Sequence, residues 1–98
     1  MHHEEPIPDA PAGLHPAGLS LWRTVCTDYG LEPWQLSILE TACRAKSQEA
    51  RCEELLAAEG YTVTTGAGMV RARPEATVLR DARAAFLRAM AALRLEVE

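Results

Sequence analysis

Apolar side chains recur at helical spacing in three stretches of the chain, and these stretches predict three helices. The first helix covers about 17–29 and the second about 33–59. Each of them stops at a glycine, Gly30 or Gly60, as is common just past the C-terminus of a helix. The third covers about 75–95, where the apolar spacing of three and four residues favours antiparallel packing against the second helix.

β-Branched and apolar residues alternate on both sides of the turn sequence Thr65-Gly66-Ala67-Gly68. This pattern predicts a two-stranded β-hairpin over about 61–72. Because an isolated hairpin is only marginally stable in water, we expect it to lean on the helices or on another subunit. The predicted fold is mainly α: a short N-terminal helix packed on a long antiparallel helical hairpin, with a small β-hairpin between the two long helices.

The two ends of the chain differ from this helical region. Residues 1–15 are rich in proline and acidic side chains and have no apolar period, so we expect a flexible leader. Residues 16–95 are then a single helical domain, and residues 96–98 are an acidic tail. This division gives one folded unit with short polar ends.

The composition predicts a thin core for a monomer. Apolar residues make up 48% of the 98 residues, but aromatic residues make up only 5%, and much of the remainder is alanine, which buries little area. We expect Trp22 and Trp34 to be core anchors, since each lies early in a helix and precedes an apolar stripe. Alanine-rich helices of this length favour oligomerisation to complete their burial.

No apolar run approaches the roughly 20 residues that cross a bilayer, and no signal peptide precedes the helices, so we expect a cytoplasmic protein without a membrane partner. Cys26, Cys43 and Cys52 are expected to be small buried thiols. Cys43 and Cys52 lie nine residues apart, on opposite faces of the second helix, and therefore cannot bridge each other.

The sequence contains no set of residues that would support catalysis. The glycine turn lacks the lysine and the spacing of a phosphate-binding loop, and no histidine lies in the expected folded region to act as a base. No cysteine and histidine residues have the spacing of a zinc site. We therefore expect no enzyme activity, no cofactor and no metal.

The net charge of −4 conceals a basic region between Gly60 and Leu95. Six arginines against two acidic residues give this part of the chain a charge of +4. Arginine binds phosphate through a planar fork, so this region is a candidate DNA-binding surface. The candidate DNA-facing residues are Arg71, Arg73, Arg80, Arg83 and Arg88.

Two questions about these arginines stay open in the sequence. Those on the third helix form one face, which could bind a nucleic-acid backbone, or could be solvated or paired with acidic residues of the second helix such as Glu49 and Glu53. The arginine-bearing hairpin could reach into a groove of DNA or pair with the edge of a neighbouring subunit.

The order of these features resembles the small subunit of tailed-phage terminases over about residues 14–95. The resemblance rests on Leu19-Ser20-Leu21-Trp22-Arg23, Leu31-Glu32-Pro33, Leu39-Glu40-Thr41-Ala42-Cys43-Arg44, Gly60-Tyr61-Thr62-Val63, and Pro74 before the last helix. It implies a non-catalytic, ring-forming packaging component that binds double-stranded viral DNA and delivers it to the large terminase subunit, which holds the ATPase and nuclease. A phage or prophage protein of this kind would act in the host cytoplasm.

A second function from another class also fits the sequence. A helical protein-binding adaptor, antitoxin-like or a scaffold, would use the arginine face to meet an acidic partner and would make no direct DNA contact. Co-purification distinguishes the two, because a large terminase subunit supports the first and a toxin or unrelated partner supports the second.

Overall fold

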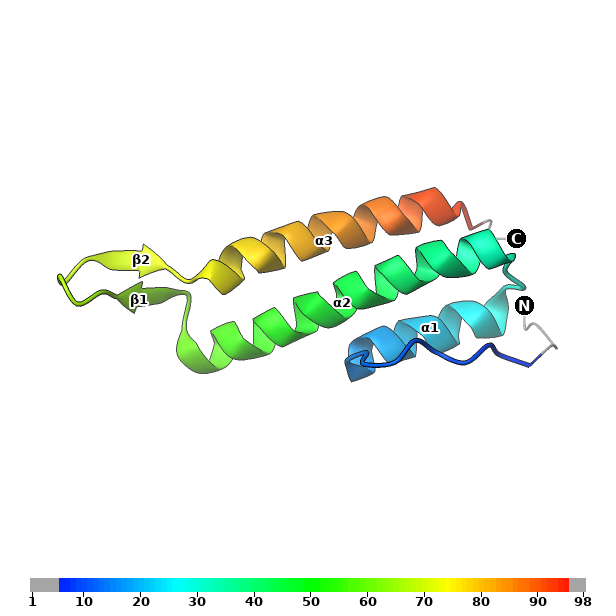
Figure 1. The fold of residues 1–98 in the computed structure, drawn as a ribbon, viewed down its shortest axis with the longest axis horizontal. Coiled ribbons are helices and arrows are strands. Elements are labelled where there is room, and N and C mark those ends of the chain that lie inside the picture. Colours follow the sequence, from blue (N-terminus) through cyan, green and yellow to red (C-terminus); the bar gives the residue numbers. More distant parts are fainter. Residues whose placement is uncertain (1–5, 96–98) are drawn as a thin grey trace.

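The computed structural model describes residues 6–95, which form three helices and one antiparallel β-hairpin (Figure 1). This confirms the predicted mainly α architecture. Residues 1–5 of the expected leader and the whole of the expected tail, residues 96–98, lie outside this range. The elements are α1 (Pro16–Asp28), α2 (Pro33–Glu59), β1 (Thr62–Thr64), β2 (Val70–Ala72) and α3 (Pro74–Leu93).

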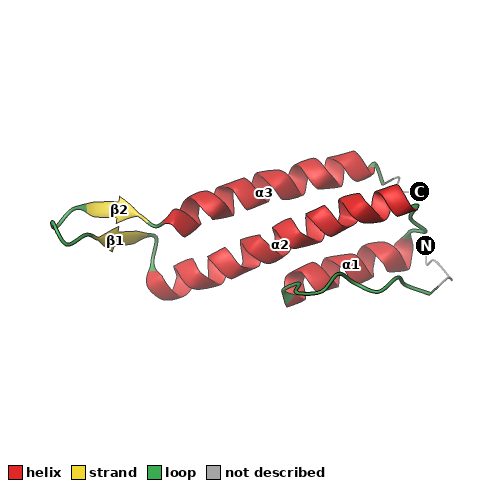
Figure 2. Cartoon of the chain, viewed as in Figure 1, coloured by secondary structure: helices red, strands yellow, loops and turns green. Residues whose placement is uncertain are grey.

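The helices α2 and α3 run antiparallel along most of an elongated molecule, 58 × 21 × 21 Å, and α2 lies between α3 and α1 (Figure 2). Each helix begins with a proline in its first turn, whose fixed backbone suits that position. The start of α2 is also a capping box, in which the Glu32 side chain accepts from a backbone N–H and Gln35 accepts from the Glu32 N–H. At its other end, Gly60 has φ +87°, which favours glycine.

The core consists of two clusters. The larger one joins all three helices and contains Trp22, Val25, Cys26, Leu39, Cys43 and Leu93. The smaller one lies near the hairpin and contains Cys52, Leu56 and Leu79. Small residues of both long helices are buried as well, among them Ala42 on α2 and Ala82 and Ala89 on α3.

The helix α1 approaches α2 closely at Gly18. A Cβ atom at this position would lie only 2.6 Å from the Cys43 carbonyl oxygen and would also collide with the Ser47 hydroxyl. The Ser47 hydroxyl donates to the Cys43 carbonyl at 2.8 Å and accepts from the His15 N–H at 3.0 Å, so this buried side chain is satisfied. The crossing of α1 and α2 therefore depends on the absence of a side chain at residue 18.

The segment of residues 8–15, which we call the strap, lies against the helices, in contrast to the flexible leader that its composition suggested. Ala10 and Leu14 pack on the larger cluster. Long side chains also donate to its backbone carbonyls: Trp22 Nε1 to Pro8 (2.9 Å), Arg44 to Ala12 (3.3 Å) and Arg51 to Gly13 (2.7 Å). Such hydrogen bonds need no apolar period in the strap, which is why the sequence pattern did not indicate them.

The β-hairpin projects beyond the helices at the end opposite the two described chain ends (Figure 1). Its register pairs Val63 with Arg71, and all six strand residues are exposed. Within the described chain the hairpin therefore does not lean on the helices, and its apolar side chains remain in contact with solvent.

The expectation that both tryptophans anchor the core is wrong for one of them. Trp22 is buried, whereas Trp34 is 57% exposed. Trp34 lies on the side of α2 that neither α1 nor α3 covers at that level, and a helical apolar stripe does not reveal which side a short neighbouring helix will choose.

Candidate nucleic-acid interface

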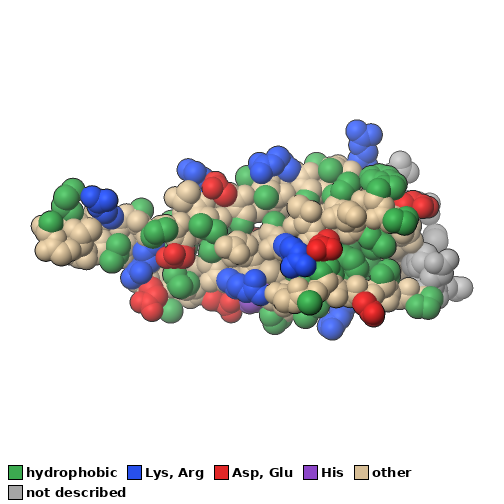
Figure 3. Space-filling model, in the orientation of Figure 1, with side chains coloured by type: hydrophobic (Ala, Val, Ile, Leu, Met, Phe, Trp, Pro, Cys, Tyr) green, Lys and Arg blue, Asp and Glu red, His purple; other side chains and the backbone are tan. Residues whose placement is uncertain are grey.

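The five candidate arginines do not form one free basic surface. Arg71 lies in β2 and Arg73 caps the start of α3, while Arg80, Arg83 and Arg88 follow along α3. Figure 3 shows basic side chains interspersed with acidic ones along the visible face of the molecule. The partners of each arginine decide which of them are available to a ligand.

Arg83 is paired with acidic residues of α2. Its Nε donates to Glu49 Oε2 at 3.0 Å, and its second guanidinium nitrogen lies 3.7 Å from Glu53 Oε1. Lys46 donates to the other oxygen of Glu49 at 3.2 Å and lies 4.4 Å from the centre of the Phe86 ring. Of the alternatives open in the sequence, pairing with Glu49 and Glu53 is the one observed for this arginine.

The charges around Glu49 act on each other's ionisation. Burial alone would raise the pKa of Glu49, but hydrogen bonds from Arg83 and Lys46 outweigh burial and hold that pKa below its ordinary value. The hydrogen bond to Glu49 likewise raises the pKa of Arg83. This ion pair joins α2 to α3 and neutralises charge that a nucleic acid would need.

Arg73 is held at the junction of the hairpin and the helices. Its guanidinium donates to the Glu59 carbonyl oxygen at 3.2 Å and lies 3.9 Å from the Glu59 carboxylate. Its Nε is buried without a hydrogen-bond partner among the described residues. These contacts hold Arg73 at the connection between α2 and α3, so its guanidinium is less available to a ligand than that of a fully exposed arginine.

The remaining three candidates are accessible. Arg71 and Arg88 are exposed and have no ion pair within residues 6–95. Among the described residues, Arg80 is paired only with the adjacent Asp81, Nε to Oδ1 at 3.4 Å, and both side chains are mostly exposed. Exposed pairs of this kind contribute little, so Arg80 keeps most of its capacity to bind an anion.

Sequence reasoning missed the exposed apolar residues. Four of them lie on or beside the hairpin strands, namely Tyr61, Val63, Met69 and Val70. Leu87 is 66% exposed among the arginines of α3. The sequence carries a sign of this exposure, because Leu87 lies on the polar side of the predicted helix and outside its apolar seam.

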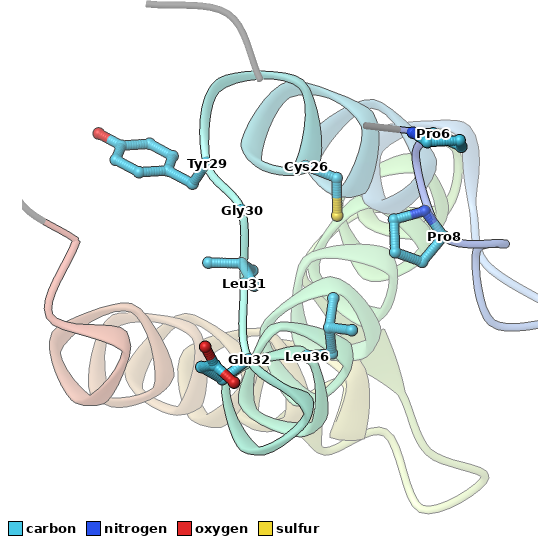
Figure 4. A pocket seen from close by; sticks show the side chains of 8 residues that line it. All are labelled: Pro6, Pro8, Cys26, Tyr29, Gly30, Leu31, Glu32 and Leu36. Atoms are coloured by element: carbon cyan, nitrogen blue, oxygen red, sulfur yellow. The ribbon is translucent and has the colours of Figure 1, made fainter. Parts of the chain in front are cut away.

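The three cysteines are buried and free. Burial raises the pKa of each thiol, to about 11 for Cys43, so none is activated as a nucleophile. Cys26 lines a pocket of about 340 Å³ at the end opposite the hairpin, together with Tyr29, Glu32 and Leu36 (Figure 4). In residues 6–95 no group of three acidic, histidine or cysteine side chains is placed to hold a metal.

None of the described helices is both long and apolar enough to span a membrane. A family profile described as "Phage terminase, small subunit" matches residues 19–97. No curated protein and no solved structure gives a significant match to the chain. The matched span contains α2, the β-hairpin and α3 in full and most of α1, and it confirms the resemblance found in the sequence. The chain belongs to the phage terminase small-subunit family.

Proposed function

We propose that this chain is the non-catalytic DNA-recognition component of a phage packaging machine. It binds double-stranded viral DNA and presents that DNA to the large terminase subunit, which carries the ATPase and nuclease. The protein acts as a ring of identical subunits. DNA contacts that are weak in one subunit add to a useful affinity when they are repeated around the ring. The family supports the general role, and the arginines support the DNA contact.

The observation that carries the DNA contact is the exposure of Arg71, Arg80 and Arg88. None of them has an acidic partner on another element within the described chain, whereas Arg73 and Arg83 do. We therefore narrow the DNA-facing set to these three. Contact through a few phosphates without a recognition helix in a groove gives binding that depends more on salt than on sequence.

The DNA contact is tested by titrating duplex DNA at several salt concentrations. The double variant Arg71→Ala, Arg88→Ala should bind more weakly and lower the slope of log K against log salt by about 0.9 for each phosphate contact removed. Arg23→Ala is the matched control, because Arg23 is an exposed arginine on α1, far along the fold from the hairpin. No affinity for DNA at low salt, or equal losses in both variants, would remove direct DNA contact from the proposal.

The exposed apolar hairpin favours a second candidate function, an adaptor that binds proteins without touching DNA. Replacing Val63 and Val70 by threonine keeps β-branched residues in the strands but removes apolar surface. If the large terminase subunit co-purifies with the wild type and not with this variant, the hairpin is a protein contact. Joined with an absence of DNA binding, that result would establish the adaptor in place of the DNA-recognition role.

A further inference from the structure

The helix α3 carries both a projecting apolar side chain and part of an apolar groove. Leu87 projects into solvent with 66% of its surface exposed. The groove lies between α2 and α3, has a volume of about 340 Å³, and is lined mainly by small and apolar residues. Its lining residues are Ile38, Thr41, Ala85, Arg88, Ala89 and Ala92.

The projection and the groove lie on opposite sides of α3 at the same height. With 3.6 residues per turn, Leu87 points about 170° away from the mean direction of Ala85, Ala89 and Ala92. At a rise of 1.5 Å per residue, the two features differ in height by only about 3 Å. A leucine on one side and a groove of alanines on the other are suited to a contact between unlike surfaces of identical chains.

Charged residues beside the two features are complementary. Arg80 lies about 20° from Leu87 around α3, while Asp81 lies on the groove side of the helix, only one residue away in height. Both side chains are mostly exposed, and their contact within one chain is a long one, 3.4 Å. When Leu87 of one copy enters the groove of the next, Arg80 of the first copy faces Asp81 of the second.

We propose that a second copy of this chain occupies the α2–α3 groove, inserting its Leu87 between Ala85, Ala89 and Ala92. The contact is heterologous, so each copy gives a leucine on one side and receives one on the other. Because the two features share one height, repeating the contact displaces each copy across the helix axes and not along them, so a rotation at each contact brings the row of copies round into a closed ring. The proposal rests on the ring assembly of the proposed function and names its subunit contact.

The same contact accounts for two isolated features of the surface. It covers Leu87, and it extends along α2 toward Trp34, which lies within about 60° of Ile38 and Thr41 around that helix. The contact uses Arg80, so of the three exposed arginines it leaves Arg71 on the projecting hairpin and Arg88 at the rim of the groove available to DNA.

Two single substitutions test the contact by light scattering of the full chain. Leu87→Lys disables the projection, and Ala92→Lys fills the groove; both positions are exposed in the single chain, so helicity by circular dichroism should be unchanged. Each variant alone should fall from the multi-subunit mass of the wild type to the monomer mass. Ala58→Lys, at an exposed alanine near the hairpin end of α2, should keep the wild-type mass.

Mixing the two defective variants in equal amounts separates this geometry from any symmetric dimer. The Ala92→Lys chain still offers a leucine and the Leu87→Lys chain still offers a groove, so the mixture should form a dimer and stop there. A monomeric wild type, an oligomer that survives Leu87→Lys, or a mixture that stays monomeric would overturn the proposed contact. An oligomer that survives would leave the proposed DNA role standing, since DNA titration tests that role separately.

Discussion

Gly18 lies where α1 crosses α2, and the absence of its side chain sets how closely the two helices approach. Gly18→Ala would push a methyl group into the Cys43 carbonyl and the Ser47 hydroxyl. We expect it to lower the free energy of unfolding by about 1–3 kcal/mol, the usual range for overpacking, as measured by urea denaturation. Gly66→Ala is the control, because a Cβ there meets nothing within 4 Å. Equal effects of both substitutions would show that the crossing is not tight.

Glu49 makes the stability of the chain depend on pH. Its pKa in the folded state is lower than the ordinary value of a glutamate, so its ion pairs stabilise the fold above that ordinary pKa, and this contribution is lost as the pH falls through the lowered pKa. Glu49→Gln should therefore lower stability at neutral pH and flatten the loss of stability between neutral and acid pH. Thermal unfolding across this range measures the effect.

Glu53→Gln provides the comparison for Glu49. Its carboxylate is half exposed and lies 3.7 Å from Arg83, so water screens the pair and the substitution should change little. The same pH profile in both variants would contradict a special role for Glu49. The sequence offered this pairing only as an alternative, because the register between α2 and α3, which brings Glu49 beside Arg83, depends on the packing of both helices.

The β-hairpin is the element with the least support from the rest of the chain. Its strands have three residues each, and all six are exposed. We expect the amide protons of Val63 and Arg71 to exchange with solvent much faster than those of Leu39 or Leu79 when the chain is alone, as hydrogen exchange would show. Comparable protection of the strands and the helices would contradict an unsupported hairpin.

The helices were predictable from the sequence because their signals are local. Apolar spacing, the prolines of the first turns and Gly60 determine where α2 begins and ends, whatever surrounds it. The position of Trp34 was not predictable in this way. Its exposure depends on which side of α2 the short helix α1 covers, and that depends on contacts such as Gly18 with Ser47, which join residues far apart in the chain.

On the scale of the whole molecule, the apolar core is unevenly distributed. The larger cluster joins three helices and also receives side chains from the strap, whereas the smaller one near the hairpin has only three buried members. Leu39→Ala should therefore cost more stability than Leu79→Ala, within the range of about 2–5 kcal/mol for such truncations. Chemical denaturation compares them. A larger loss at Leu79 would mean that the hairpin end holds the molecule together.

The charge pattern of the whole chain predicted a basic half, but not which of its arginines are paired within the chain and which are exposed. Counting arginines between Gly60 and Leu95 identified the region, and only the structure separates Arg83, which bridges two helices, from Arg88, which does not. Likewise, the groove is formed by residues of two elements and has no counterpart in a linear pattern. The spacing of Leu87 from the apolar seam was the one sign of a second surface on α3.

The separation of the hairpin from the helical scaffold has a consequence for how such chains can diverge. Since the scaffold buries none of the strand side chains, the segment from Thr62 to Ala72 can be lengthened, shortened or replaced without repacking the core. This segment is therefore a suitable site at which to insert or exchange a sequence. A chain built in this way can change its projecting tip while the packing of its three helices stays the same.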